Sequence, residues 1–305
     1  MHRQSPIYVR IALLAACLLP AGCGSVDAGK FSAWSEAARQ VESGADASFD
    51  ALEQDARDSA VLTAPDRKIG REGFPLLNAQ GESYDLATPL GRLRASLDML
   101  CRYADALAKL AGAGNAADVD HSAQDLAASL RSLQGSGISA ATANGLSTAV
   151  DAYGQALLAS ARKDGLRRTM DQAQPGLDRL AEEMRQALPE LRLYLQNIKL
   201  RYLGFVDADG VRPRYGSWAR YQFDLGAAGQ LAQYDRLDQA LGSADRALQA
   251  FPDTHRQLRR SLDDPGERLE RLRDFIAEAR VCGASTARCP ANRRTEWTIT
   301  TWPKA

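Results

Sequence analysis

Long apolar stripes at helical spacing constrain the fold of this chain more than any other feature. In each stripe, apolar side chains recur every three or four residues, which places them on one face of an α-helix. The clearest stripe follows Thr88-Pro89, a favoured cap before a first-turn proline, and it contains Leu93, Leu97, Leu100, Cys101, Ala104, Leu107 and Ala111. Such a face has to be buried against other helices, so several stripes predict a helical bundle.

The same spacing recurs along most of the chain. We expect helices over 31–43, 48–62, 88–111, 121–133, 141–158, 177–198, 225–248 and 269–276. Pro175, Pro189 and Pro252 are expected to kink or interrupt helices. Residues 63–87 and 204–217 contain Pro or Gly and read as loops, the first with a small hairpin around 79–81. The predicted fold class is all-α, a multi-helix antiparallel bundle with long loops.

The N-terminal segment has the layout of a secretory signal. Arg3 and Arg10 supply positive charge, residues 11–19 are uniformly apolar, and no acidic residue occurs before Asp27. A transmembrane helix needs about 20 apolar residues, and this run is too short. The alternative is a helix buried in the N-terminal part of the fold.

The residues that follow, Ala21-Gly22-Cys23, resemble the lipobox of bacterial lipoproteins, although Pro20 departs from the usual pattern. The resemblance implies cleavage before Cys23 and lipid attachment to that cysteine. Plain export with a free or paired Cys23 stays open. Gly24, and not an aspartate, follows the cysteine, which resembles an outer-membrane destination facing the periplasm. The expected organisation is a signal peptide (1–22), a lipidated tether (23–30), a helical bundle (31–281) and a C-terminal tail (282–305).

The charge balance excludes some classes of partner. Without residues 1–22, which hold two arginines and no acid, the chain has 36 basic and 38 acidic side chains. This even balance argues against nucleic acid and against electrostatic attraction to a membrane.

The cysteines fit an oxidising compartment. Cys282 and Cys289 enclose a short loop, CGASTARC, and are expected to form a disulfide. Cys101 lies on an apolar helical face and is expected to be a buried thiol. The alternative pairs Cys101 with one of the C-terminal cysteines.

No constellation of catalytic or metal-binding residues is visible. After the signal only His121 and His255 remain, and neither GxSxG nor HExxH occurs. The cysteines form no CxxC pair and lack nearby histidines. We therefore predict no catalytic residue, no metal and no cofactor.

The most distinctive segment is 201–223, in which aromatic and arginine side chains gather. These residue types dominate binding hot spots. The candidate partner-binding residues are Tyr202, Arg212, Arg214, Tyr215, Trp218, Arg220 and Tyr221. The alternative is that the rings simply pack this loop onto the bundle.

The C-terminal tail has a different pattern. Thr295, Trp297, Ile299 and Thr301 alternate with other side chains at a period of two, which predicts a strand or an irregular segment.

These features favour a non-catalytic, membrane-anchored envelope lipoprotein that binds an unknown envelope protein or supports an envelope complex. The first alternative is a protein that holds a small molecule or lipid between its helices. A less favoured alternative is an envelope hydrolase that uses glutamate and histidine. Nucleic acid is not an expected partner.

Overall fold

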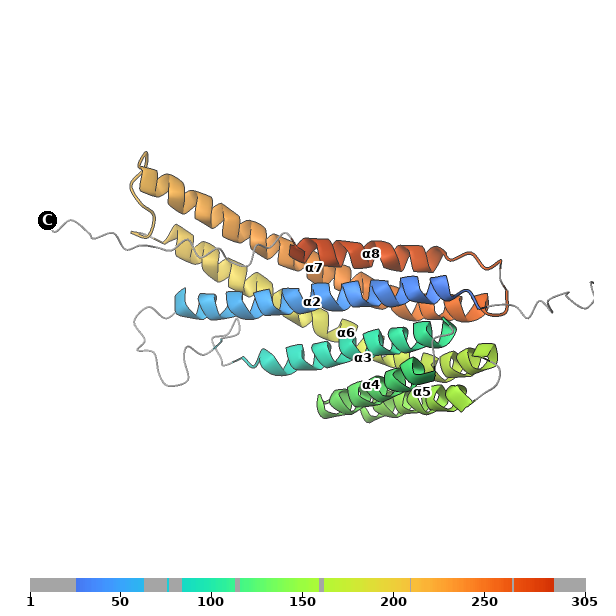
Figure 1. Ribbon diagram of the computed structural model, residues 1–305. Coiled ribbons are helices and arrows are strands. Elements are labelled where there is room, and N and C mark those ends of the chain that lie inside the picture. Colours follow the sequence, from blue (N-terminus) through green and yellow to red (C-terminus); the bar gives the residue numbers. More distant parts are fainter. Residues whose placement is uncertain are drawn as a thin grey trace, which may run out of the picture.

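The structure is an elongated bundle of long α-helices (Figure 1). The computed structural model describes residues 26–62, 76, 84–112, 116–158, 162–208, 210–264 and 266–287. These ranges hold no strand, and their helices are α2 (Ala28–Leu62), α3 (Ala87–Ala111), α4 (Ala116–Gly135), α5 (Ala140–Leu158), α6 (Arg162–Asp207), α7 (Trp218–Ser261) and α8 (Glu270–Ala287). The predicted all-α class is confirmed. The signal segment, most of the expected hairpin around 79–81 and the strand-like tail lie outside the described residues.

Helix α2 is one continuous helix, where the sequence pattern predicted two. Its buried face runs without interruption through Phe31, Trp34, Ala38, Val41, Ala45, Phe49, Leu52 and Ala56. Gly44 lies inside the segment predicted as a gap. A Cβ at this position would lie 2.8 Å from the carbonyl carbon of Cys282, so the glycine allows the backbone of α8 to approach α2.

Helix α3 begins one residue earlier than predicted, and its cap is different. The Oδ1 atom of Asp85 accepts hydrogen bonds from the backbone N–H groups of Ala87 (3.1 Å) and Thr88 (3.2 Å). Hydrogen bonding to Thr88 lowers the pKa of Asp85. Asp85 therefore satisfies first-turn donors that the sequence analysis assigned to Thr88.

The two longest helices continue through their prolines. Helix α6 has 46 residues and contains Pro175 and Pro189, and α7 has 44 residues and contains Pro252. A proline inside a helix removes one backbone hydrogen bond and costs about 3 kcal/mol. Buried side chains lie on both sides of each proline in α6, among them Leu177, Leu180, Met184, Leu188, Leu191 and Leu195. Burial of this stripe holds the helix together, so the predicted interruptions do not occur.

A row of ion pairs joins α6 to α7, its antiparallel neighbour. The pairs, with the α6 residue first, are Arg167–Asp263, Asp171–Arg259, Asp178–Arg256, Arg185–Asp245, Arg192–Asp238 and Lys199–Asp235. From Asp171 to Lys199 the α6 members are seven residues apart, the repeat of a coiled-coil seam. The first pair joins a base of α6 to Asp263, two residues after the end of α7. The next two pairs join acids of α6 to bases of α7, and the last three join bases of α6 to acids of α7.

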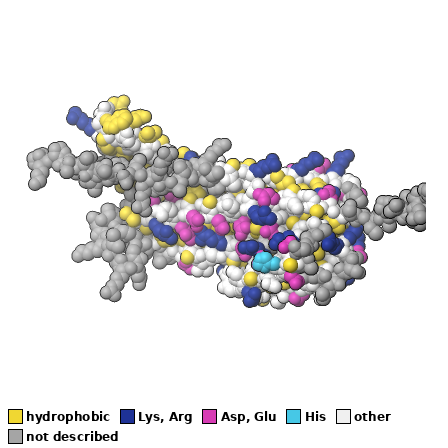
Figure 2. All heavy atoms as spheres, viewed as in Figure 1, with side chains coloured by type: hydrophobic (Ala, Val, Ile, Leu, Met, Phe, Trp, Pro, Cys, Tyr) yellow, Lys and Arg dark blue, Asp and Glu magenta, His cyan; other side chains and the backbone are white. Residues whose placement is uncertain are grey.

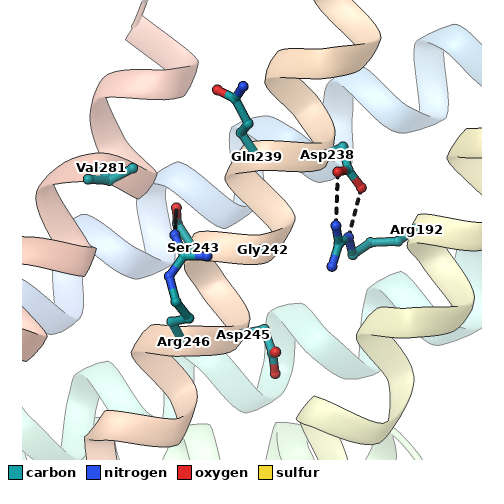
Figure 3. A pocket seen from close by; sticks show the side chains of 8 residues that line it. All are labelled: Arg192, Asp238, Gln239, Gly242, Ser243, Asp245, Arg246 and Val281. Atoms are coloured by element: carbon teal, nitrogen blue, oxygen red, sulfur yellow. Dashed lines mark hydrogen bonds and ion pairs between the residues drawn. The ribbon is translucent and has the colours of Figure 1, made fainter.

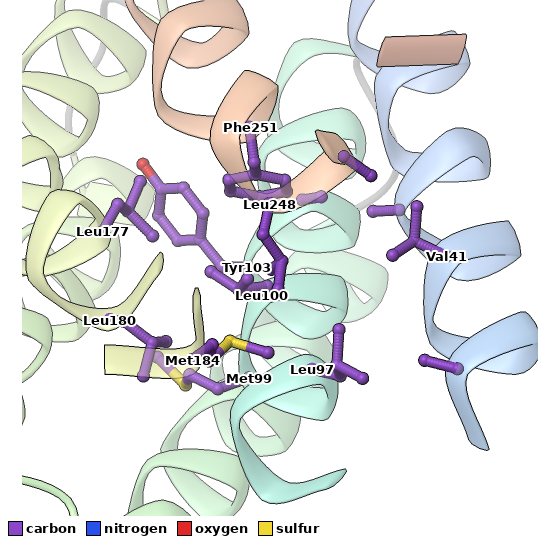
Figure 4. Packing of buried hydrophobic residues seen from close by; sticks show 14 of the residues in the cluster. Val41, Leu97, Met99, Leu100, Tyr103, Leu177, Leu180, Met184, Leu248 and Phe251 are labelled. Carbon is purple, nitrogen blue, oxygen red and sulfur yellow. The ribbon is translucent and has the colours of Figure 1, made fainter. Parts of the chain in front are cut away.

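The core lies between α2, α3, α6 and α7. Figure 4 shows side chains of α3 facing those of α6 and α7, with Val41 of α2 at the other side; the labelled residues include Leu97, Leu100, Tyr103, Leu177, Leu180, Leu248 and Phe251. Trp34 of α2 packs against Phe251, with ring centroids 4.7 Å apart. The aromatic contacts of Trp34 therefore join α2 to α7, within a core that α3 and α6 complete.

The cysteines differ from the expected arrangement. Cys282 is a free thiol buried inside α8, 3.8 Å from the carbonyl oxygen of Val41, so the expected Cys282–Cys289 disulfide is not present at Cys282. The physical reason is that α8 continues to Ala287 and turns Cys282 inward against α2. Burial raises the pKa of Cys282 to about 12. Cys101 is also a free, buried thiol, as predicted, whereas Cys289 lies outside the described residues.

Helices α5 and α6 cross at two glycines. A Cβ at Gly176 would lie 2.8 Å from the carbonyl carbon of Gly145 and 2.9 Å from the nitrogen of Leu146. A Cβ at Gly145 would lie 3.0 Å from the Cα of Gly176. The two backbones are therefore in direct contact, which no residue with a side chain would allow.

We predict opposite effects for a glycine substitution inside this crossing and one outside it. Gly176→Ala should lower the free energy of unfolding by about 1–3 kcal/mol, because the new methyl group overlaps the α5 backbone. Gly154→Ala is the control, because a Cβ there meets nothing within 4 Å, and it should raise stability by about 0.5–1 kcal/mol. Urea unfolding followed by circular dichroism measures both, and equal effects would contradict the contact.

Candidate functional site

The α6–α7 hairpin ends in a short, well-capped loop. Helix α6 ends at Asp207 and α7 begins at Trp218, close to the loop predicted from sequence. Ser217 caps α7, because its Oγ accepts a hydrogen bond from the backbone N–H of Arg220 at 3.1 Å. Gly210 (φ 83°) and Gly216 (φ 76°) adopt the left-handed conformation that turns of this kind require. The described residues before α7 are therefore held by the Ser217 cap and by the conformations of these two glycines.

Large apolar side chains gather at this end of the hairpin and are open to solvent. Tyr215 is 91% exposed, Trp218 71%, Tyr221 55% and Leu225 57%. The rings of Trp218 and Tyr221 stack, with centroids 5.1 Å apart. Figure 2 shows hydrophobic side chains at the projecting end, beside a basic one. We call Tyr215, Trp218, Tyr221 and Leu225 the apex surface.

The predicted arginines have different environments. Asp224 accepts hydrogen bonds from Arg220 (2.7 Å) and Arg212 (3.0 Å), and the pKa of Asp224 is lowered mainly by the bond from Arg220. Arg214 is exposed and makes no ion pair with a described residue. Two of the three guanidinium groups therefore brace the loop, and Arg214 is the one that faces outward.

Tyr202 does not join the apex surface. Its ring packs edge-on against Tyr234 of α7, with centroids 5.8 Å apart, and it is half-buried. The alternative raised by the sequence, ring packing onto the bundle, holds for Tyr202 but not for Tyr215, Trp218 and Tyr221. Leu225 was missed as a site residue, although its spacing from Trp218 and Tyr221 places all three on one helical face.

A buried carboxylate lies near the base of the projecting part. Asp55 of α2 is 2% exposed and accepts hydrogen bonds from the side-chain amides of Gln230 and Gln233 of α7, both at 3.0 Å. Burial raises its pKa to about 6, and the two amides act in the opposite direction. The contact fixes α2 to α7 below the apex surface.

The two histidines considered for a hydrolase differ in burial and lie on different helices. His121 is an exposed residue of α4, 3.8 Å from Asp125. His255 of α7 is fully buried, with Nε2 2.9 Å from the Tyr103 hydroxyl and Nδ1 2.6 Å from Gln174 Oε1. The Gln174 oxygen only accepts, so Nδ1 carries the proton and Tyr103 donates to Nε2. Burial lowers the pKa of His255 to about 3, and its imidazole is not accessible from the surface.

A groove of about 430 Å³ lies between α6, α7 and α8 (Figure 3). Its charged side chains already have protein partners. Arg192 bonds both oxygens of Asp238, Arg185 bonds Asp245, and Arg246 pairs with Glu278. The charged side chains that line the groove are therefore paired with other side chains of the bundle.

An apolar cavity between α2, α3, α7 and α8 has a volume of about 10 Å³. This is about the space of one water, so the cavity cannot hold the ligand of the alternative hypothesis. In the described part of the chain, no cluster of three or more His, Cys, Asp or Glu side chains could hold a metal ion. Nor does any helix there have the length and apolar character needed to cross a membrane.

Comparisons with protein-family models, with curated proteins and with solved structures found no match to this chain.

The Asp55 contact gives a pH-dependent prediction. The pKa of Asp55 is raised to about 6 in the folded state, above its value in the unfolded chain. Its contribution to stability is therefore fully present below the unfolded-state pKa, where Asp55 is protonated in both states, and is lost as pH rises through 6. Asp55→Asn removes the buried charge while keeping a hydrogen-bond acceptor. It should therefore raise the free energy of unfolding at pH 8 by up to about 3 kcal/mol, and the gain should disappear near pH 4.

Urea titrations of both proteins between pH 4 and pH 8 measure this difference. Asp120 of α4 provides the control, because it is exposed and its charge does not act on Asp55, so Asp120→Asn should not change the pH dependence. A constant difference between Asp55→Asn and the parent protein at every pH would show that Asp55 is not buried in its charged form.

Proposed function

We propose that this chain is a non-catalytic lipoprotein of the bacterial cell envelope that binds a partner protein through the apex surface. Cys23 would carry the lipid and hold the chain on the outer membrane, facing the periplasm. The observation that carries the proposal is the exposure of Tyr215, Trp218 and Tyr221 together at the projecting end of the hairpin. Tyr and Trp lose few rotamers on binding and bury large areas, which is why they dominate interface hot spots.

The position of the apex surface supports this function. Figure 1 shows the start of α2 at one end of the bundle and the α6–α7 turn at the other. Helix α2 alone is 35 residues, or about 50 Å, long. A chain anchored just before α2 would therefore present its aromatic end away from the membrane that holds it.

The charge distribution supports a local binding site. Along the α6–α7 pair, the acidic and basic side chains satisfy one another. At the apex, uncompensated apolar area is combined with the outward-facing Arg214. A buried aromatic centre with an arginine at its rim is the usual make-up of a protein–protein hot spot.

We predict that Trp218→Ala combined with Tyr215→Ala abolishes capture of an envelope partner. The experiment is in-cell crosslinking of the full-length chain, followed by purification and mass spectrometry. Loss of two central aromatic anchors should lower the yield of a specific partner by at least about tenfold. Leu193→Ala is the matched control, since Leu193 is an exposed apolar residue of α6 away from the apex.

Unchanged circular dichroism of the double variant would show that the helices are intact. Capture that is equal in the double variant and in Leu193→Ala would refute binding at the apex. A Cys23→Ala chain tests the anchor separately, because it should leave the membrane fraction and lose any partner that requires envelope attachment.

A further inference from the structure

Helix α8 covers only part of α7. Glu278 of α8 pairs with Arg246, and Val281 lines the groove beside Gly242 and Ser243. Helix α8 then ends at Ala287, whereas α7 extends back to Trp218 (Figure 1). The N-terminal part of α7 therefore lies beyond the end of its neighbour.

The exposed stripe of α7 lies on the same side of the helix as α8. Eighteen residues correspond to about five full turns, so residues separated by eighteen point in the same direction. Tyr221 therefore matches Gln239, Leu225 matches Ser243 and Ala228 matches Arg246. Gln239, Ser243 and Arg246 all line the groove beside Val281 of α8. The apolar stripe is thus a continuation of the α7 face on which α8 lies.

The surface of this stripe has both large and small side chains. Trp218, Tyr221 and Leu225 are followed by Ala228, Gly229 and Ala232, all of them exposed. A Cβ at Gly226 or Gly229 would meet nothing within 4 Å. The small residues therefore leave room for a bulky side chain beside the large ones.

We propose that the segment following α8, residues 288–305, docks on this stripe and places Trp297 and Ile299 against Tyr221 and Leu225. The stripe continues the α7–α8 interface, and the segment starts where α8 ends. In an extended strand, alternate side chains such as Trp297 and Ile299 are about 7 Å apart on one face. Tyr221 and Leu225, four residues apart on a helix, are separated by about 6 Å along its axis, so the two spacings match.

The length of the segment is sufficient. Val281 lies beside Gly242, so Ala287 lies about 9 Å further on, level with residues near 236 of α7. Leu225 is then about 17 Å away along the axis. Ten residues, from 288 to Trp297, span up to about 33 Å when extended. Trp297 therefore reaches Leu225 and Tyr221 with slack in the chain.

Docking would regulate the apex surface, a consequence that rests on the function proposed above. A partner that buries Trp218 and Tyr221 has to displace the segment, so the two compete for one surface. The docking itself does not depend on any partner, and it is tested without one.

The test is site-specific photo-crosslinking in the full-length, detergent-solubilised chain. Benzoylphenylalanine replaces Leu225 in one protein and Leu200 in another, since Leu200 is an equally exposed residue of α6. We expect irradiation to join position 225 to residues 295–302 within one chain, at a yield independent of protein concentration and at least about tenfold above that from position 200. In the protein that carries the crosslinker at position 225, the double substitution Trp297→Ser and Ile299→Ser should lower this yield by about tenfold. Thr298→Ala is the control, because in an extended segment this side chain would point to the opposite face, and it should leave the yield unchanged.

Several results would overturn the docking. Crosslinks between two copies, rising with concentration, would assign the stripe to self-association. Crosslinks to another protein, or equal yields from positions 225 and 200, would show that residues 288–305 do not cover the stripe. Intrachain crosslinks combined with equal capture in the Trp218→Ala/Tyr215→Ala variant and in Leu193→Ala would support the docking and refute partner binding at the apex. Capture lost only in the double variant, without intrachain crosslinks, would refute the docking and support the proposed function.

Discussion

The pairing of α6 with α7 is the constraint on which the rest of the structure depends. Each ion pair between them is partly exposed and so contributes only about 0–1 kcal/mol. Their effect is on register. Because acids lie on α6 at Asp171 and Asp178 and bases at Arg185 and Arg192, sliding one helix along the other would bring like charges together where the pattern reverses. Burial supplies the energy, and the charges select one alignment.

The sequence predicted the fold class because burial has a simple signature. Stripes such as the one through Leu93, Leu97 and Leu107 repeat at helical spacing, and they are buried in the structure. Helix boundaries were less predictable. Pro175 and Pro189 have a local preference against helix that the buried stripe of α6 overrides, and the cap at Asp85 was assigned to Thr88. The spacing of Cys282 and Cys289 indicated a loop, but continued helix turns Cys282 into the core.

The candidate site was predictable in composition and not in detail. Aromatic and arginine residues clustered between 201 and 223 and marked the region. Which of these residues are exposed depends on their contacts in the folded chain: Tyr202 packs on Tyr234 and Arg220 binds Asp224. Asp55 and Gln174 gave no signal, because their roles come from residues more than 75 positions away in sequence, on other helices. A polar residue on a helical face is expected at the surface, and only the packing of α2, α6 and α7 shows otherwise.

The projecting hairpin also has a mechanical consequence. Its two helices run along the long axis, and their cross-links, from Asp171–Arg259 to Lys199–Asp235, lie across it. A pull on the apex along that axis, against the start of α2, moves α6 and α7 together, so the ion pairs keep the two helices in register. The load then falls in shear on the contacts that join the hairpin to the rest of the bundle, among them Asp55 with Gln230 and Gln233. A sideways pull would bend the free end about its base, where Asp55 meets Gln230 and Gln233. The same bundle would therefore be stiff to tension and compliant to bending.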